Sequence, residues 1–524
     1  MRKTIIKKHF AKLIITAILF SQNGAIFPAF SQDRFLKNTV QASGTVDTVL
    51  SINNSFETGQ SDACDRNKLH RLKESKSLPD QEGLKIYPAP EGEKASDYYK
   101  VKVNGKNVHV YEARVSKEPI NLAWPQPRQR PLEQTELSGF AYWDMSEPVK
   151  IEIESISKNI SNVMVRPLSL KIAPTINDNK IFFTLTNPSN FVVEVNDFHN
   201  ALHLFANPIE TDIPDINDPS VTCFGPGVHY PGYMALNSNE TVYIAGGAVV
   251  HGYIHIKNAS NVTVRGRGIL DTSTYTDFPT WTNNSFYILK SEGIRIEGFI
   301  KRDPPNWAFR MVYSTNILVD NVKIIGAWRY NTDGFGVFEC NDTTIRNTFV
   351  RSFDDSILFK SEYDGHLSTF PAYKVKRNFL VENCTIWTDW GYSLGVAHEV
   401  SAGPVSGIVF KNCDILHNMA SNQALQVNPR KGGYVNGVEF RNIRVEDAQT
   451  GLIGVYNHAD NILFQNISVL NGPSPTSGIM GANAGRQVRD ITIQNLVIHG
   501  RKILNAAQGN FRIGPFAQNI QFLP

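Results

Sequence analysis

From about residue 240 onward, the chain repeats one short pattern, and this repeat limits the possible folds more than any other feature. Each unit reads N/G-h-x-h-x-N/G-h-x-h, where h is apolar, as in NVTVRGRGI at 261, NILVDNVKI at 316 and NILFQNISV at 461. Successive units lie 23 to 36 residues apart. Such a repeat predicts a solenoid in which each coil buries its apolar residues only against its neighbours. Because each unit holds two short strands, we expect a right-handed parallel β-helix.

The repeat bends at one position that is asparagine in many units. Asparagine and glycine tolerate the left-handed backbone conformation that a sharp corner between two strands needs. Stacked from coil to coil, the side-chain amides are expected to hydrogen-bond into a ladder. The asparagines at this position are Asn321, Asn347, Asn383, Asn412, Asn442, Asn466 and Asn495.

Acidic residues precede two strand-like runs inside the repeat. Asp333 comes before FGVF, and Asp354 and Asp355 come before SILF. Asp333 and Asp354 are 21 residues apart, which is about one coil, and one coil climbs by ~4.8 Å. The spacing therefore predicts three carboxylates at one corner of adjacent coils, an arrangement suited to glycoside hydrolysis. Taken singly, each motif is also typical of an ordinary turn, since aspartate is common there.

The N-terminal part of the chain divides into three segments. Residues 1–31 have a basic start, a short apolar core and small residues near Ser31, which predicts a cleaved secretory signal peptide. The apolar run is too short to span a bilayer, which argues against a membrane anchor. Residues 32–80 form a polar leader. Residues 81–205 hold about eight short alternating runs, which predict an antiparallel β-sandwich that packs on the start of the β-helix at 206–524.

Charge and cysteine content exclude some classes of protein. Removing the five Lys and Arg of residues 1–31 from the total of 52 leaves 47 basic against 49 acidic residues, so nothing indicates nucleic-acid binding. The five cysteines are too few and too scattered for a disulfide scaffold. Cys384 and Cys413 occupy the same register in VENC and FKNC, and are either stacked small core residues or a disulfide pair.

The segments NTDG and DDSILFKS resemble the signature of the polygalacturonase-like β-helix hydrolases, glycoside hydrolase family 28. They equally resemble the related family 49, the dextranase and isopullulanase group, whose members also carry an N-terminal β-sandwich. The resemblance covers about residues 240–450 and implies an inverting mechanism. It implies that Asp354 protonates the leaving oxygen, that Asp333 and Asp355 activate water, and that Lys360 lies near the sugar hydroxyls. In physical terms, three adjacent carboxylates do not all stay ionised, so one keeps its proton.

Two departures from the family 28 pattern bear on the substrate. Trp390 stands where those enzymes have the histidine of a Gly-His-Gly segment. Gln426 and Asn428 stand where they have an Arg-x-Lys that holds the galacturonate carboxylate. A uronate carboxylate needs a fixed cation, so neutral amides favour a neutral sugar, which a tryptophan platform also suits. A four-residue shift of the alignment would instead bring Arg430 and Lys431 to these places.

Further candidate residues flank the acids along the chain. A lone histidine such as His398 is more often structural than functional, and a tryptophan in this context lines either the binding groove or the core. The remaining substrate-binding candidates are Trp307, Trp328, Tyr330, Tyr392 and His398.

The sequence predicts a secreted glycoside hydrolase of a neutral α-linked polysaccharide, with the protein in the extracellular or periplasmic space. We expect a monomer with no cofactor and no metal, and with no nucleic-acid or membrane partner after signal cleavage. The alternatives are a pectin-type polygalacturonase, a polysaccharide lyase and a carbohydrate-binding solenoid without chemistry. Linkage, endo or exo action and glycosylation do not follow from the sequence.

Overall fold

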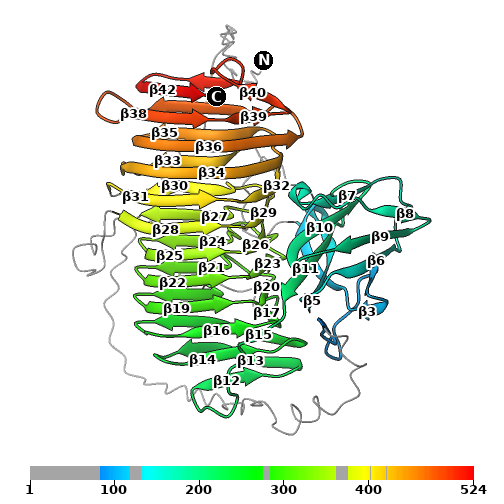
Figure 1. The fold of residues 1–524 in the computed structure, drawn as a ribbon. Coiled ribbons are helices and arrows are strands. Elements are labelled where there is room, and N and C mark those ends of the chain that lie inside the picture. The colour runs from blue at the N-terminus through cyan, green and yellow to red at the C-terminus, as the bar shows by residue number, and fades with distance from the viewer. Residues whose placement is uncertain (1–82, 118–130, 275–283, 362–375, 402, 420–421) are drawn as a thin grey trace, which may run out of the picture. The chain divides into compact units, whose positions relative to one another are not determined.

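The computed structural model describes residues 83–524, apart from 118–130, 275–283, 362–375, 402 and 420–421. The predicted signal peptide and polar leader lie outside the described residues. The described chain is almost entirely β-structure, with two 3₁₀ turns, η1 (Leu132–Gln134) and η2 (Leu168–Leu170). No helix in this part of the chain is long and apolar enough to cross a membrane. The predicted all-β class, in which an N-terminal sandwich precedes a parallel β-helix along the chain, is confirmed (Figure 1).

The N-terminal sandwich consists of two sheets. The first has the order β1 (Leu84–Ile86), β5 (Thr135–Met145), β11 (Leu202–Pro208), β10 (Ser189–Val195) and β7 (Val163–Arg166), with β4 (Tyr111–Ser116) also beside β5. The second has the order β3 (Lys106–Val108), β2 (Tyr99–Val103), β6 (Val149–Ser155), β9 (Lys180–Leu185) and β8 (Thr175–Asn177). Pairing is antiparallel except between β11 and β5, which run parallel. The sandwich sheets thus extend to Pro208.

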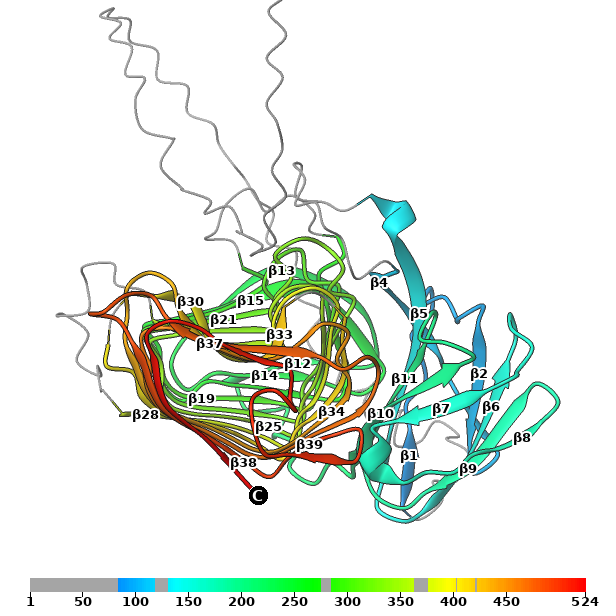
Figure 2. The ribbon, with the colours of Figure 1, turned by 90° about the horizontal axis from the view of Figure 1, so that it is seen from above.

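The β-helix is a continuous set of 31 strands whose coils stack in parallel register. Each coil contributes to three walls, which we call walls A, B and C in chain order (Figure 2). Wall A contains β12 (Val221–Phe224), β14 (Thr241–Ile244), β16 (Thr263–Gly266), β19 (Glu292–Glu297), β22 (Thr315–Asp320), β25 (Asn341–Arg346), β28 (Lys376–Glu382), β31 (Ser406–Lys411), β34 (Val435–Asp447), β36 (Ala459–Asn471), β38 (Val488–Gln494) and β42 (Ala517–Leu523).

Walls B and C contain the other strands, and β15 spans both, because its first half pairs with β17 and its second half with β18. Wall B contains β17 (Ile269–Asp271), β20 (Ile300–Arg302), β23 (Lys323–Ile325), β26 (Phe349–Ser352), β29 (Thr385–Thr388), β32 (Asp414–Asn418) and β39 (Leu496–Ile498), with β40 (Arg501–Ile503) antiparallel to β39. Wall C contains β13 (Gly227–Leu236), β15 (Ala248–Lys257), β18 (Phe286–Leu289), β21 (Phe309–Val312), β24 (Phe335–Phe338), β27 (Ile357–Ser361), β30 (Leu394–Val400), β33 (Gln423–Pro429), β35 (Gly451–Asn457), β37 (Thr476–Gly481) and β41 (Phe511–Ile513).

The asparagine corner lies between walls A and B, where all seven predicted residues have positive φ, between 52° and 57°. Amide-to-amide hydrogen bonds connect Asn412, Asn442, Asn466 and Asn495 at 2.8–2.9 Å, which confirms the ladder in the later coils. The earlier coils use other acceptors. Asn321, for example, donates to Asn207 of the sandwich at 3.1 Å. Asn347 donates to Asp320 of the preceding coil at 2.8 Å.

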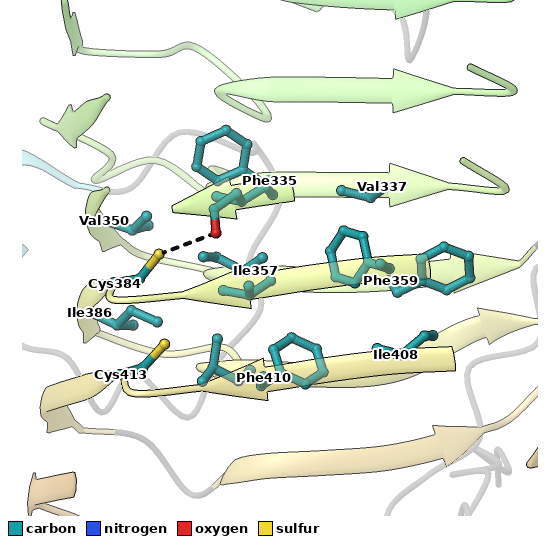
Figure 3. Packing of buried hydrophobic residues seen from close by; sticks show 14 of the residues in the cluster. Phe335, Val337, Val350, Ile357, Phe359, Cys384, Ile386, Ile408, Phe410 and Cys413 are labelled. Atoms are coloured by element: carbon teal, nitrogen blue, oxygen red, sulfur yellow. Dashed lines mark hydrogen bonds between the residues drawn. The ribbon is translucent and has the colours of Figure 1, made fainter. Parts of the chain in front are cut away.

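Apolar residues stacked at matching positions fill the interior of the β-helix (Figure 3). Phe410 and Phe440 stack with ring centroids 5.0 Å apart and planes 8° apart. Cys384 and Cys413 follow one another in this core, and both thiols are free. The alternative of a disulfide between them is therefore wrong. Cys223, by contrast, is disulfide-bonded.

The sandwich packs against the outer side of wall B. Its aromatic residues Phe140 and Phe205 share one apolar cluster with Ile269, Ile300 and Phe349 of the β-helix. The contact is not confined to the first coils. It continues to Glu446 at the end of β34, where Arg166 Nη1 of the sandwich lies 2.7 Å from the carboxylate. The sandwich thus covers a long stretch of wall B and leaves wall C uncovered by this contact.

The buried Glu446 carboxyl predicts a pH-dependent stability. Burial raises its pKa from the ordinary 4.5 to about 7, although Arg166 lowers it in part. A raised pKa in the folded protein means that folding opposes ionisation, so this group weakens the fold as pH rises from about 4.5 to above 7. We expect the free energy of unfolding of the wild type, relative to Glu446→Gln, to fall by about 3 kcal/mol between pH 4.5 and pH 8. Chemical denaturation of both proteins at these two pH values measures the difference; a constant difference contradicts it.

Candidate active site

The three predicted acids meet at the corner between walls B and C. Asp333 precedes β24, whereas Asp354 and Asp355 lie between β26 and β27. Phe335 pairs with Ile357, so the coil advances by 22 residues and places Asp333 beside Asp355, not beside Asp354. The Gly334 amide accordingly donates to the Asp355 carbonyl at 2.8 Å. The spacing argument located the right corner, and the structure shifts the pairing by one residue.

Two glycines allow the coils to approach closely at this corner. A Cβ atom on Gly334 would lie 2.4 Å from the Ser356 carbonyl oxygen. A Cβ atom on Gly391, in the next coil, would lie 2.3 Å from the Asp355 nitrogen and 2.8 Å from Asp354 Oδ1. Any larger residue would therefore displace the backbone that holds the acids. This close approach accounts for the glycine of the NTDG segment.

Backbone amides fix the orientation of the acid pair. The Asp355 amide donates to Asp354 Oδ1 at 3.0 Å, and the Tyr392 amide donates to Asp355 Oδ1 at 3.1 Å. Asp333 retains only 2% of its surface exposed, whereas Asp354 and Asp355 retain 9% and 6%. The acid pair is therefore the part of the cluster that a ligand at this corner reaches first.

Lys360 is the cation of the site. Its Nζ lies 3.4 Å from Asp333 Oδ2, 3.3 Å from Asp355 Oδ2 and 3.1 Å from Glu399 Oε2. One buried ammonium thus balances part of the charge of several carboxylates. It also lies 4.7 Å from the Trp307 ring centroid, which adds a cation–π contact.

Glu399 is a site residue that the sequence reasoning missed. The pairing of β27 with β30 is regular to Phe359 and Val396, and then jumps so that Ser361 faces Val400. The extra residues include His398, whose φ is 60°. Such a bulge re-aims the following side chain, and here Glu399 reaches Lys360. The repeat pattern contains no signal for this irregularity.

The carboxyl groups of the site differ in their pKa values. Burial, together with the neighbouring Asp333 and Asp355 charges, raises the pKa of Asp354 well above its usual range. Burial raises the pKa of Asp333 to about 8, with Lys360 opposing that rise. Glu399 behaves in the opposite way: Lys360 and His398 outweigh burial and hold its pKa at about 2. At neutral pH the site therefore keeps a proton on Asp354 and for the most part also on Asp333, whereas Glu399 is ionised.

Three predicted aromatic residues lie around the acids. Trp307 stacks on Phe338 with centroids 5.2 Å apart and planes 13° apart. Trp390 stacks on Phe353, the residue before the acid pair, at 5.8 Å. Tyr330 contacts the same Phe353 ring edge-on at 5.5 Å. Aromatic rings thus border the acids from the preceding and the following coils.

Tyr392, His398 and Trp328 differ in their distance from the acids. The Tyr392 backbone amide donates a hydrogen bond to Asp355. The Tyr392 ring centroid lies 4.8 Å from that of His398, and the Tyr392 hydroxyl accepts a hydrogen bond from Arg430 Nη2 at 3.3 Å. Burial lowers the pKa of His398 to about 4, so this ring is neutral at pH 7. Trp328 is buried and donates to Asp303 at 3.0 Å, which places it in a separate cluster.

The predicted amide positions lie on β33 of wall C, two coils beyond β27, the strand that follows the acid pair. Gln426 pairs with Gly395 and Asn428 with Ala397. The Gln426 amide is fully buried, and its Nε2 and Oε1 have no hydrogen-bond partner in the described structure. Asn428 accepts from Asn457 at 2.6 Å. Among the described residues, no group of three or more His, Cys, Asp or Glu is placed to hold a metal ion.

The fold and this corner together define a class of protein: a parallel β-helix with clustered carboxyl groups of the kind used to hydrolyse glycosidic bonds. Residues 249–461 match the family model described as glycosyl hydrolases family 28. The resemblance to this group of β-helix hydrolases, predicted from NTDG and DDSILFKS, is thereby confirmed.

Individual relatives are distant. A Vitis vinifera protein described as "Probable polygalacturonase" is 24% identical over 180 residues, which is 33% of this chain and 35% of that protein. The match thus spans about a third of the relative's length. Among solved structures, Dex49A from Penicillium minioluteum has a TM-score of 0.58 and 16% identity over 82% of this chain and 94% of that chain. This likeness supports the fold. A Yersinia enterocolitica family 28 exopolygalacturonase has a TM-score of 0.44 and 12% identity, covering 84% and 97% of the two chains.

Proposed function

We propose that this protein is a secreted, inverting glycoside hydrolase of a neutral, α-linked polysaccharide, with a dextran-like glucan as the first candidate. The observation that carries the proposal is the cluster of Asp333, Asp354 and Asp355 around Lys360. It combines a carboxyl group that holds its proton at neutral pH with carboxylates stabilised by a cation. This pairing of an acid with a base is what glycosidic bond hydrolysis needs. The pattern of residues 1–31 supports secretion.

The residues divide the reaction between them. Asp354 gives its proton to the leaving glycosidic oxygen as the bond to the anomeric carbon breaks. Asp355, as the carboxylate, takes a proton from the water that attacks the same carbon from the opposite face; Asp333 can take this role only in its ionised fraction, since its pKa is about 8. The products are two sugar chains, and the anomeric configuration is inverted. Lys360 lies 3.3 Å from Asp355 and lowers the pKa of Asp333, so it favours the ionised base beside the protonated acid.

The neutral character of the substrate follows from the amide positions. Gln426 and Asn428 provide donors and acceptors but no charge for a uronate carboxylate. The fully buried, unpaired Gln426 amide lies on the outer side of wall C, two coils beyond the strand that follows the acid pair. Lys360 is already shared between three carboxylates, which also argues against its use as the proton abstractor of a lyase.

A pectin-type polygalacturonase is the second candidate, and one observation favours it. Arg430 lies in the same region and donates to the Tyr392 hydroxyl, so a cation is present beside the predicted binding residues. The description of the Vitis vinifera relative agrees with this alternative.

A substrate panel separates the two candidates. We expect reducing sugar to be released from dextran or pullulan, with the product anomer, read by NMR before mutarotation, opposite to that of the substrate bond. Arg430→Gln should leave this activity within about threefold of the wild type, because a neutral sugar needs no cation. Activity on polygalacturonate alone, abolished by Arg430→Gln, would replace the neutral-sugar proposal by the pectin alternative.

A further inference from the structure

A row of aromatic side chains runs along the outer side of wall C, on the coils before the acids. Tyr233 of β13 faces Tyr253 of β15 in register, and their ring centroids lie 5.2 Å apart. His255 contacts both Tyr233 and Tyr287 of β18, at 5.1 Å and 5.6 Å. Tyr230 lies beside this row and stacks on His251 at 4.7 Å with planes 9° apart. We call Tyr230, Tyr233, Tyr253, His255 and Tyr287 the aromatic row.

The aromatic row is continuous with the active site. Tyr287 pairs in register with Arg310 of β21, and Arg310 lies over the rings of Tyr287, Trp307 and Phe338 at 5.8, 5.1 and 5.4 Å. Trp307 in turn lies under Lys360. From β13 to β27 there are five coil steps through β15, β18, β21 and β24. At ~4.8 Å each, the row begins about 24 Å from Lys360.

The far end of the row is open to solvent. Tyr230 is 72% and Tyr233 is 50% exposed, which places them among the most exposed large apolar side chains of the described chain. Exposed aromatic rings arranged in a row present their faces to ligands. The apolar C–H face of a hexose stacks on such a surface while the sugar hydroxyls stay in water. Two cations lie over Tyr287 of the row: Arg310, which is also held against the rings of Trp307 and Phe338, and the exposed Lys257 at 5.5 Å.

We propose that the aromatic row is a distal binding site for a neutral glucan chain, which extends from the acids toward the N-terminal coils over several sugar units. This inference rests on the proposed function and adds to it that long chains are the preferred substrates. The row steps forward by one coil at a time from β13 to β18, and Arg310 and Trp307 continue it to Lys360, so a single polymer lying along it reaches the active site without changing direction. A neutral chain fits because the exposed members are tyrosines.

Binding tests the proposal without turnover. In the Asp354→Asn background, the added double substitution Tyr230→Ala/Tyr233→Ala should weaken affinity for dextran about tenfold, measured by affinity electrophoresis in dextran gels. Tyr230→Phe/Tyr233→Phe keeps the rings and should retain binding. Phe516→Ala, an exposed aromatic position on the last coil, is the matched control and should also retain it. In the active enzyme, the ratio of kcat/KM for dextran to that for isomaltotriose should fall about tenfold in the alanine variant.

The outcomes distinguish the row from the active site. Unchanged dextran binding in the alanine variant overturns the row even if the enzyme hydrolyses dextran. Weakened binding to polygalacturonate with no dextran binding overturns the neutral occupant. Dextran binding that is lost in the alanine variant and kept in the phenylalanine variant supports the row. If the wild type binds dextran in this way but releases no reducing sugar from it, only the proposed hydrolysis is refuted.

Discussion

Asp354→Asn should lower kcat on the preferred polysaccharide by about 10³-fold while leaving substrate binding within a few fold of the wild type. The asparagine has nearly the shape of the protonated aspartic acid but has no proton to give to the leaving oxygen, and general acid catalysis contributes about 10² to 10⁴ in rate. Because the lost interaction is made only in the transition state, kcat falls and binding does not. Steady-state kinetics with reducing-sugar detection, together with a binding titration, measure the two effects.

Asp490→Asn is the matched control for this substitution. Asp490 is an exposed corner residue with φ 56°, a conformation that asparagine accepts as readily as aspartate. The same chemical change there should leave kcat unaltered. If Asp354→Asn turns over substrate at the wild-type rate, Asp354 is not the general acid, and the division of roles within the acid cluster is wrong.

Lys360→Met should have the second large effect, a loss of at least about 10²-fold in kcat at pH 7 and a clear loss of stability. The substitution removes the ammonium that lies within 3.4 Å of Asp333, Asp355 and Glu399. Since Lys360 lowers the pKa of Asp333, its removal raises that pKa above about 8, and the already small ionised fraction of Asp333 at pH 7 falls further. The limb of the pH–activity profile on which activity rises with pH should therefore move to higher pH. Leaving buried charge unpaired also costs about 3–5 kcal/mol of folding free energy.

A double variant separates charge balance from simple disruption. Glu399→Gln removes one negative charge from the same cluster, so Lys360→Met/Glu399→Gln should recover part of the activity and stability that Lys360→Met loses. Lys257→Met, at an exposed lysine that lies over Tyr287, is the control for the loss of a lysine and should leave the pH profile in place. An unchanged pH–activity profile in Lys360→Met would show that Lys360 does not set the ionisation of the acids.

Local periodicity explains which features were predictable. The h-x-h runs and the asparagine at each bend describe one coil, and every coil meets only copies of itself, so the sequence was enough to predict the solenoid and the ladder at Asn442 and Asn466. The same logic brought Asp333 to the acid pair, because a chain distance of one coil becomes a neighbour contact. Counting residues does not define register to a single residue, and Asp355, not Asp354, faces Asp333.

Contacts that depend on irregularity or on distant segments were not predictable. Glu399 reaches Lys360 only because β30 bulges at His398. Glu446, on a strand that reads like the others, is buried because Arg166, 280 residues earlier, closes over it from the sandwich. The local sequence pattern contains no signal for the bulge at His398 or for the burial of Glu446.

The sequence by itself thus determined the coil, its corners and the presence of an acid cluster, because a solenoid converts spacing along the chain directly into position in space. The tertiary structure alone decided which carboxyl keeps its proton and which carboxylates Lys360 binds. Those properties depend on burial and on separations of a few ångströms, and these are established only when the walls and the sandwich pack together.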